Sequence, residues 1–89
     1  MAWRIELSEE AERNLQKLDR QTVSRLLRFL HERVARLDDP RALGKPLKGS
    51  DLGKFWRYRV GDYRIVAHIA DAELLVLVVR IGHRREVYR

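Results

Sequence analysis

The pattern of apolar and polar residues changes its period twice along the chain. Apolar residues first occupy every second position, which predicts a half-buried strand over residues 1–7 with Trp3, Ile5 and Leu7 on its inner side. The spacing is helical from residue 8 to residue 37, and it alternates again in the last part of the chain. The pattern therefore predicts a strand, a helical region and then a group of strands.

Two helices are predicted between the strands. Ser8 is a good N-cap for the first, and Asp19 is a good N-cap for the second. The Asp38-Asp39-Pro40 sequence ends the second helix. Both helices have one apolar stripe, formed by Ala11, Leu15 and Leu18 in the first and by Val23, Leu26, Leu27, Leu30, Val34 and Leu37 in the second.

The last part of the chain reads as a three-stranded meander after a loop over residues 41–53. Gly61-Asp62 is a hairpin-turn signal, and residues 70–73 give a second, weaker one. Residues 74–79 are apolar at every position, which is typical of a central strand covered on both faces. In the first strand the alternation predicts that Trp56, Tyr58 and Val60 face the helices, and that Phe55, Arg57 and Arg59 face away.

These elements predict one α+β domain over residues 1–89. Its order is β-α-α-β-β-β, with the N-terminal strand and the helix hairpin packed on one face of a small antiparallel sheet. A domain of 89 residues has a thin core. We therefore expect the active surface to be a shallow groove on the sheet rather than a deep cavity.

The chain is strongly basic, with 19 Lys and Arg against 13 Asp and Glu and a net charge of +6. A polyanion is the natural partner of such a surface. The absence of cysteine excludes disulfides and thiolate metal sites, and the first ten residues lack the apolar run of a signal peptide. No apolar run is long enough to cross a membrane. We therefore expect a cytoplasmic protein.

Arginines gather in the predicted meander. Arg57 and Arg59 project from the same face of their strand, and Arg64 joins them if the turn register allows. Three guanidinium groups so placed repel one another unless an anion lies between them, and phosphate suits the planar fork of arginine. Lys45 and Lys48 in the preceding loop are further candidates for phosphate binding.

The arginines of the meander, and a second set on the outer face of the second helix, also have simple structural explanations. The carboxylates of Asp62, Glu73 and Glu86 are available to pair with the arginines of the meander. The outward residues of the second helix read most simply as a solvated face, and they are Arg20, Arg25, Arg28, Arg33 and Arg36.

The C-terminal segment adds groups suited to chemistry. His83, Arg84, Arg85 and Tyr88 follow the central strand, so we expect them to emerge beside the bare face. His83 carries an imidazole, a group that can accept or donate a proton, and Tyr88 offers a ring for a base and a hydroxyl that can donate a proton. Together with the arginines, these groups match the needs of RNA cleavage without a metal or other cofactor, and no cluster of metal ligands is visible in the sequence.

The segments YRVGDYRIV and RIGHRREVY resemble the RelE branch of the RelE/ParE toxin superfamily, and the resemblance covers nearly the whole chain. It implies a RelE-like fold and a toxin held silent by a cognate antitoxin whose flexible segment wraps around it. It also implies functional roles for Arg64, Arg84 and Tyr88, which stand at positions that the nuclease members keep. Arg57 and Arg59 stand where well-studied members carry lysines.

The resemblance leads to a hypothesis with two alternatives. The leading hypothesis is a toxin that cleaves messenger RNA on the ribosome by attack of the 2′-OH, thereby inhibiting translation. Because arginine effectively never gives up its proton, the hypothesis assigns the general base to His83. The alternatives are a ParE-like toxin that inhibits gyrase and a non-catalytic basic module that binds RNA or an acidic partner.

Overall fold

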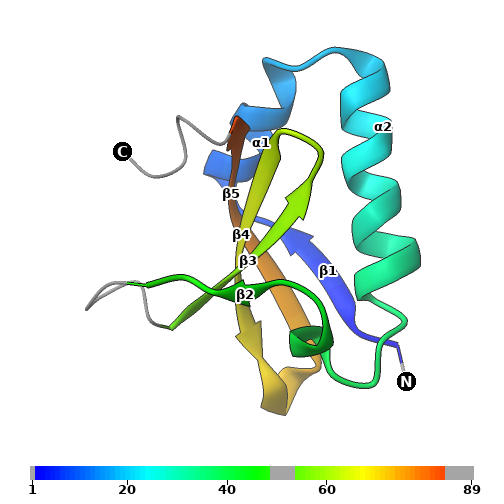
Figure 1. Cartoon of the computed structure of the whole chain (residues 1–89), viewed down its shortest axis with the longest axis vertical. Coiled ribbons are helices and arrows are strands. Elements are labelled where there is room, and N and C mark those ends of the chain that lie inside the picture. The colour runs from blue at the N-terminus through cyan, green and yellow to red at the C-terminus, as the bar shows by residue number, and fades with distance from the viewer. Residues whose placement is uncertain (1, 49–53, 84–89) are drawn as a thin grey trace.

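The helical layer begins at the caps that the sequence predicts. The computed structural model describes residues 2–48 and 54–83, and in it α1 (Glu9–Gln16) and α2 (Arg20–Arg28) lie against a sheet (Figure 1). The Ser8 hydroxyl accepts a hydrogen bond from the Ala11 amide and donates one to the Val79 carbonyl. This N-cap therefore also fastens α1 to the sheet.

The second helix changes its winding before it ends. After α2 the chain continues as a π-helical segment, η1 (Phe29–Val34), in which the Ala35 amide donates to the Leu30 carbonyl five residues earlier. Leu26, Leu30 and Val34 are fully buried along both segments, as the predicted stripe requires. Among the residues that the structure describes, no helix is long and apolar enough to cross a membrane.

The described part of the chain forms a sheet of five strands in the order β1-β5-β4-β3-β2. The strands β3 (Phe55–Val60), β4 (Tyr63–Ala70) and β5 (Leu75–His83) form the predicted antiparallel meander. The first strand, β1 (Arg4–Leu7), lies beside β5, so β5 has a neighbour on each side. Short 3-10 helices, η2 (Pro40–Ala42) and η3 (Asp71–Glu73), complete the fold.

Two details of the predicted sheet are wrong. The sheet is mixed, because β1 runs parallel to β5. Parallel neighbours require a long connection, and here it runs through the helices and the other strands. The predicted loop also contains a short edge strand, β2 (Lys45–Pro46), which pairs with β3. The α+β class and the packing of the helix hairpin on one face are confirmed.

The core lies between the helices and one face of the sheet. Tyr58 and Val60 of β3 point into it, as the alternation predicts, and so do Ile65 and Ala67 of β4. Among the described residues, the opposite face carries only a small apolar cluster, in which Leu47 and Val66 are buried with Phe55 and Val79 beside them. This leaves most of the second face available to charged side chains.

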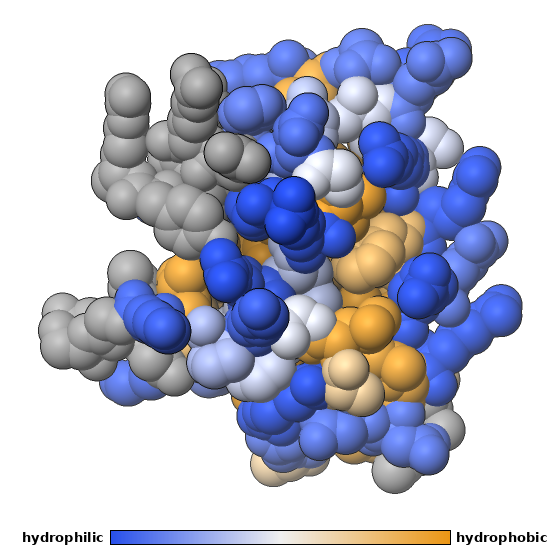
Figure 2. Space-filling view, in the orientation of Figure 1, coloured by the Kyte–Doolittle hydropathy of each residue, from blue (hydrophilic) through white to orange (hydrophobic). Residues whose placement is uncertain are grey.

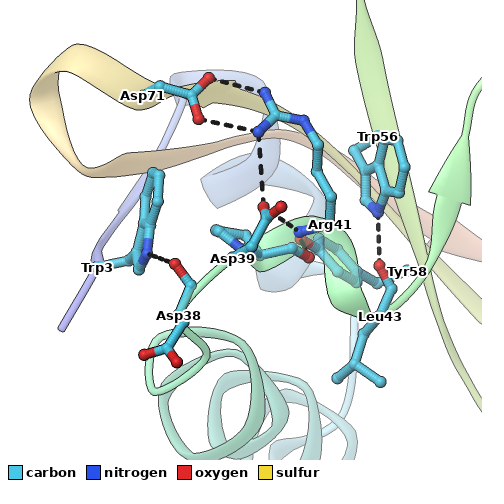
Figure 3. Close-up of polar contacts among 9 residues, drawn as sticks. Trp3, Asp38, Asp39, Arg41, Leu43, Trp56, Tyr58 and Asp71 are labelled. Atoms are coloured by element: carbon cyan, nitrogen blue, oxygen red, sulfur yellow. Dashed lines mark hydrogen bonds and ion pairs between the residues drawn. The ribbon is translucent and has the colours of Figure 1, made fainter. Parts of the chain in front are cut away.

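The segment between η1 and β2 is fastened from several sides (Figure 3). The Arg41 guanidinium donates two hydrogen bonds, of 2.9 and 2.8 Å, to the carboxylate of Asp71 in η3. The buried Tyr58 hydroxyl donates to the Pro40 carbonyl at 2.7 Å, and the Trp56 indole donates to the Leu43 carbonyl at 2.6 Å. These contacts fix the chain that leads into β2, which carries Lys45.

Candidate functional site: a cationic groove along β3

The register of the β3–β4 hairpin brings three arginines to one face. Arg59 lies directly opposite Arg64 across the two strands, and Arg57 lies opposite Val66, which belongs to the cluster on the bare face. Residues that face each other in an antiparallel pair project from the same side of the sheet. Arg64 therefore joins Arg57 and Arg59, which resolves the turn register that the sequence left open.

A groove of about 470 Å³ lies at the edge of β3, beyond the point where β2 stops pairing with it. Every charged residue among the described residues that line it is a cation. These cations come from η1, β2, β3 and β4, and they are Arg33, Lys45, Arg57, Arg59 and Arg64. Such a lining favours an anion, because like charges repel one another at this spacing until a counter-charge enters.

Arg64 is the most unusual of these cations, because only 7% of it is exposed. Its guanidinium donates a hydrogen bond of 3.3 Å to the Tyr63 carbonyl, and within residues 2–48 and 54–83 it has no carboxylate partner. A buried charge is costly unless it is paired. A phosphate in the groove would supply the missing negative charge.

The other wall of the groove is apolar. Phe29 and Leu43 contribute to it, and Tyr58 lies at its base, where the ring of Phe29 meets that of Tyr58 edge to face with centroids 6.0 Å apart. Figure 2 shows apolar surface between the polar side chains over the sheet and those of the α2 layer. The groove thus combines a charged wall with an aromatic one.

The ion pairs among the described residues lie elsewhere. Arg41 pairs with Asp71 and Asp39, Arg80 pairs with Glu10, and Arg4 pairs with Glu6. Of the carboxylates suggested as partners for the arginines of the meander, Asp62 and Glu73 make no ion pair within the described part of the chain, and Glu86 lies outside it. Carboxylates of the described residues therefore leave Arg59 and Arg64 unneutralised.

The structure places the other predicted site residues as follows. Lys45 lines the groove, whereas Lys48 lines an adjoining hollow of about 230 Å³ together with Arg57. Arg84, Arg85 and Tyr88 lie outside the described residues.

His83 is not where the sequence predicts it. It is the last residue of β5 and pairs with Tyr63, against whose ring its own ring packs at 6.0 Å. Tyr63 packs against the main core, on the helix side of the sheet, whereas Gly82 is the β5 residue opposite Arg64. The prediction that His83 shares a face with the arginines is therefore wrong, because its strand extends to residue 83 and the alternation points it the other way.

Phe29, Arg33 and Leu43 are residues of the groove that the sequence interpretation did not assign to it. Arg33 was placed with the solvated arginines of the second helix. It is exposed, as that interpretation expects, and it also lines the groove from η1. No group of three or more His, Cys, Asp or Glu side chains suited to a metal ion occurs in the described portion of the chain.

Comparisons of sequence and comparisons of structure both relate this chain to toxins of toxin-antitoxin systems. A family model described as the ParE toxin of type II toxin-antitoxin systems matches residues 5–88. Toxin RelG of Mycobacterium tuberculosis is 30% identical over 89 residues, with 100% of this chain and 99% of that protein covered. Toxin RelE of the same organism is 32% identical over 87 residues, with 98% and 87% covered.

Solved structures agree. The crystal structure of the toxin-antitoxin complex RelBE2 from Mycobacterium tuberculosis contains a chain with 27% identity and a TM-score of 0.85, which covers 97% of this chain and 95% of that one. The fold and these matches define a toxin of a type II toxin-antitoxin system. The chain belongs to the RelE/ParE toxin superfamily, with RelE-like relatives.

Proposed function

We propose that this chain is a ribosome-dependent endoribonuclease that cleaves messenger RNA and thereby inhibits translation. The observation that carries the proposal is the groove along β3, where five cations and no described carboxylate surround a space of about 470 Å³. The relatives named RelE and RelG support the RelE-like branch over other members of the superfamily.

The reaction needs no cofactor. The 2′-hydroxyl of a ribose gives its proton to water while its oxygen attacks the adjacent phosphorus. The bond from phosphorus to the 5′-oxygen breaks, and the products are a 2′,3′-cyclic phosphate and a 5′-hydroxyl. Negative charge accumulates on the phosphoryl oxygens in the transition state, where Arg57, Arg59 and Arg64 would stabilise it. Arg84 and Tyr88 are proposed from the family resemblance, Tyr88 as the acid that protonates the departing oxygen.

The proposed partners follow from the shape of the site. An open groove gives little hold on a free strand, and the ribosome would supply the orientation that the toxin lacks. Several similar structures are complexes of RelE with RelB, so we propose a RelB-like antitoxin as the partner that keeps this toxin inactive in the cytoplasm.

A second candidate function is inhibition of gyrase. It is favoured by the description of the matching family model as a ParE toxin. The buried Arg64 and its cationic neighbours have no evident use in that activity. A supercoiling assay with purified gyrase separates the two candidates, because only a ParE-like toxin would inhibit the enzyme.

The experiment for the nuclease uses purified ribosomes programmed with a defined messenger RNA. Arg64→Ala should lower the cleavage rate by roughly 100- to 1000-fold, the usual cost of losing one donor to a developing oxyanion. Arg36→Ala is the matched control, since it removes an exposed arginine that does not line the groove. In cells, growth arrest that persists with Arg64→Ala would indicate a toxin that acts by binding alone.

A further inference from the structure

The helix-side wall of the groove has features that the proposed cleavage chemistry does not use. Phe29 and Arg33 both lie on η1 and both line the groove, opposite the arginines of the hairpin. Single π-helical turns are uncommon and are frequently found at functional sites. The π-helical segment therefore makes this wall a candidate for contact with a ligand group other than the reacting phosphate.

Phe29 is held in a fixed orientation while part of its side chain stays accessible. Its ring packs edge to face, with an interplanar angle of 63°, on Tyr58. Tyr58 is fully buried and its hydroxyl is bonded to Pro40, so the support beneath Phe29 is rigid. Phe29 itself is only half-buried and, with Leu43, forms the apolar part of the wall. A partly exposed aromatic ring on a fixed support is a surface on which a nucleobase can lie.

Arg33 adds a positive charge beside the apolar residues of this wall. It is exposed, follows Phe29 by four residues, and has no ion pair with a described carboxylate. Successive phosphates of a single strand flank each base. In an RNA strand whose reacting phosphate binds Arg57, Arg59 and Arg64, the neighbouring base would lie next to that phosphate. The next phosphate would lie on the far side of this base, within reach of the wall that carries Arg33.

We propose that Phe29 and Arg33 form a nucleotide subsite for single-stranded RNA, in which Phe29 stacks on one base and Arg33 binds the phosphate that flanks it. The subsite rests on the proposed function in that its ligand is the RNA to be cleaved. It adds a contact to a base, and hence a means of discrimination between bases, to a groove that otherwise recognises only phosphate.

The test is a nuclear magnetic resonance titration of the purified chain at low ionic strength. Adenosine 5′-monophosphate should bind about fivefold or more tightly than ribose 5-phosphate, which lacks the base, since stacking contributes ~1–3 kcal/mol. Phe29→Leu keeps an apolar side chain in the core but removes the ring, and it should bring the two affinities together. Phe29→Trp should keep the preference. A preference that survives in Phe29→Leu overturns the stacking role.

A second ligand tests Arg33. The dinucleotide pApA carries one more phosphate than adenosine 5′-monophosphate and should bind more tightly to the parent chain. Arg33→Gln should remove this gain, whereas the control Arg36→Gln should keep it. Equal effects of the two substitutions would overturn the role of Arg33, and a parent chain that binds none of these ligands at millimolar concentration would overturn the subsite.

These outcomes are separable from those for the nuclease. A chain that binds the nucleotides as described but leaves messenger RNA intact on ribosomes keeps the subsite and refutes the nuclease. A chain that cleaves, but whose preference for the base survives in Phe29→Leu, keeps the nuclease and refutes the subsite. A groove that accepts only an acidic peptide would show neither nucleotide preference, and it would also refute the subsite.

Discussion

Arg59 and Arg64 lie directly opposite each other across the β3–β4 pair, so two guanidinium groups share one cross-strand position. Like charges at such positions are destabilising. Arg64 is also almost fully buried, and it has no carboxylate partner among the described residues. The hairpin therefore holds an arrangement that is unfavourable in the free protein and becomes favourable when a phosphate enters.

Replacement of Arg59 should make the protein more stable and less active as a nuclease. Arg59→Gln removes the repulsion with Arg64, so we expect the free energy of unfolding to rise by ~0.2–1 kcal/mol at low salt, as measured by urea denaturation. The same variant should cleave messenger RNA more slowly. Arg36→Gln is the control and should change neither quantity. A variant at position 59 that is less stable than the parent would show that this pair is not under electrostatic strain.

The paired hydrogen bonds between Arg41 and Asp71 should make the stability of the protein depend on pH. The two hydrogen bonds from Arg41 lower the pKa of the Asp71 carboxyl in the folded state. A lowered folded pKa stabilises the protein above the unfolded value of about 3.8, and this contribution is lost as the pH falls through the folded pKa.

Asp71→Asn should therefore be less stable than the parent at pH 6–7, and the difference should shrink as the pH falls below about 4. Urea denaturation at several pH values measures it. Glu73→Gln is the matched control, because Glu73 lies in the same short helix and has no ion pair within the described residues. A difference for Asp71→Asn that is independent of pH would assign its effect to packing.

Two glycines give a matched test of the groove wall. Both Gly44 and Gly61 have positive φ, so alanine is strained at each, by roughly 1–2 kcal/mol. A Cβ at Gly61 would meet the flexible Arg25 side chain, whereas at Gly44 it would lie 2.2 Å from the Arg57 carbonyl oxygen. Gly44→Ala should therefore be the more destabilising in urea denaturation and should also impair cleavage. Equal losses of stability for Gly44→Ala and Gly61→Ala would mean that the segment before β2 can shift away from β3 and avoid the contact with the Arg57 carbonyl oxygen.

His83 should be dispensable for cleavage. Its ring lies against Tyr63 on the helix side, away from Arg59 and Arg64. His83→Ala should retain the parent rate of cleavage on programmed ribosomes, with at most a small loss of stability from the missing ring contact. A cleavage rate lowered by 100-fold or more, with the fold intact by circular dichroism, would show that His83 takes part in catalysis.

The sequence predicted most of the fold because its signals are local. Caps at Ser8 and Asp19, the apolar stripes and the alternation through Tyr58 and Val60 each depend on residues a few positions apart. The parallel pairing of β1 with β5 was missed because it joins residues about seventy positions apart.

The candidate site was predicted only as far as strand register could be inferred. Arg57 and Arg59 share a face by alternation alone, and the two-residue turn then places Arg64 with them. His83 was misplaced because the sequence does not reveal where β5 ends. Arg33 was missed because the sequence does not distinguish an exposed helical arginine that borders a groove from one that faces open solvent.

The central claim is that the groove along β3 cleaves messenger RNA and that Arg64 is essential to it. The most direct test maps the 5′ ends of messenger RNA after induction of the parent chain, Arg64→Ala and the control Arg36→Ala in bacterial cells. We expect new 5′ ends within translated regions for the parent and for Arg36→Ala, and none for Arg64→Ala. New ends at the same positions and frequency with Arg64→Ala, or none with the parent, would contradict the claim.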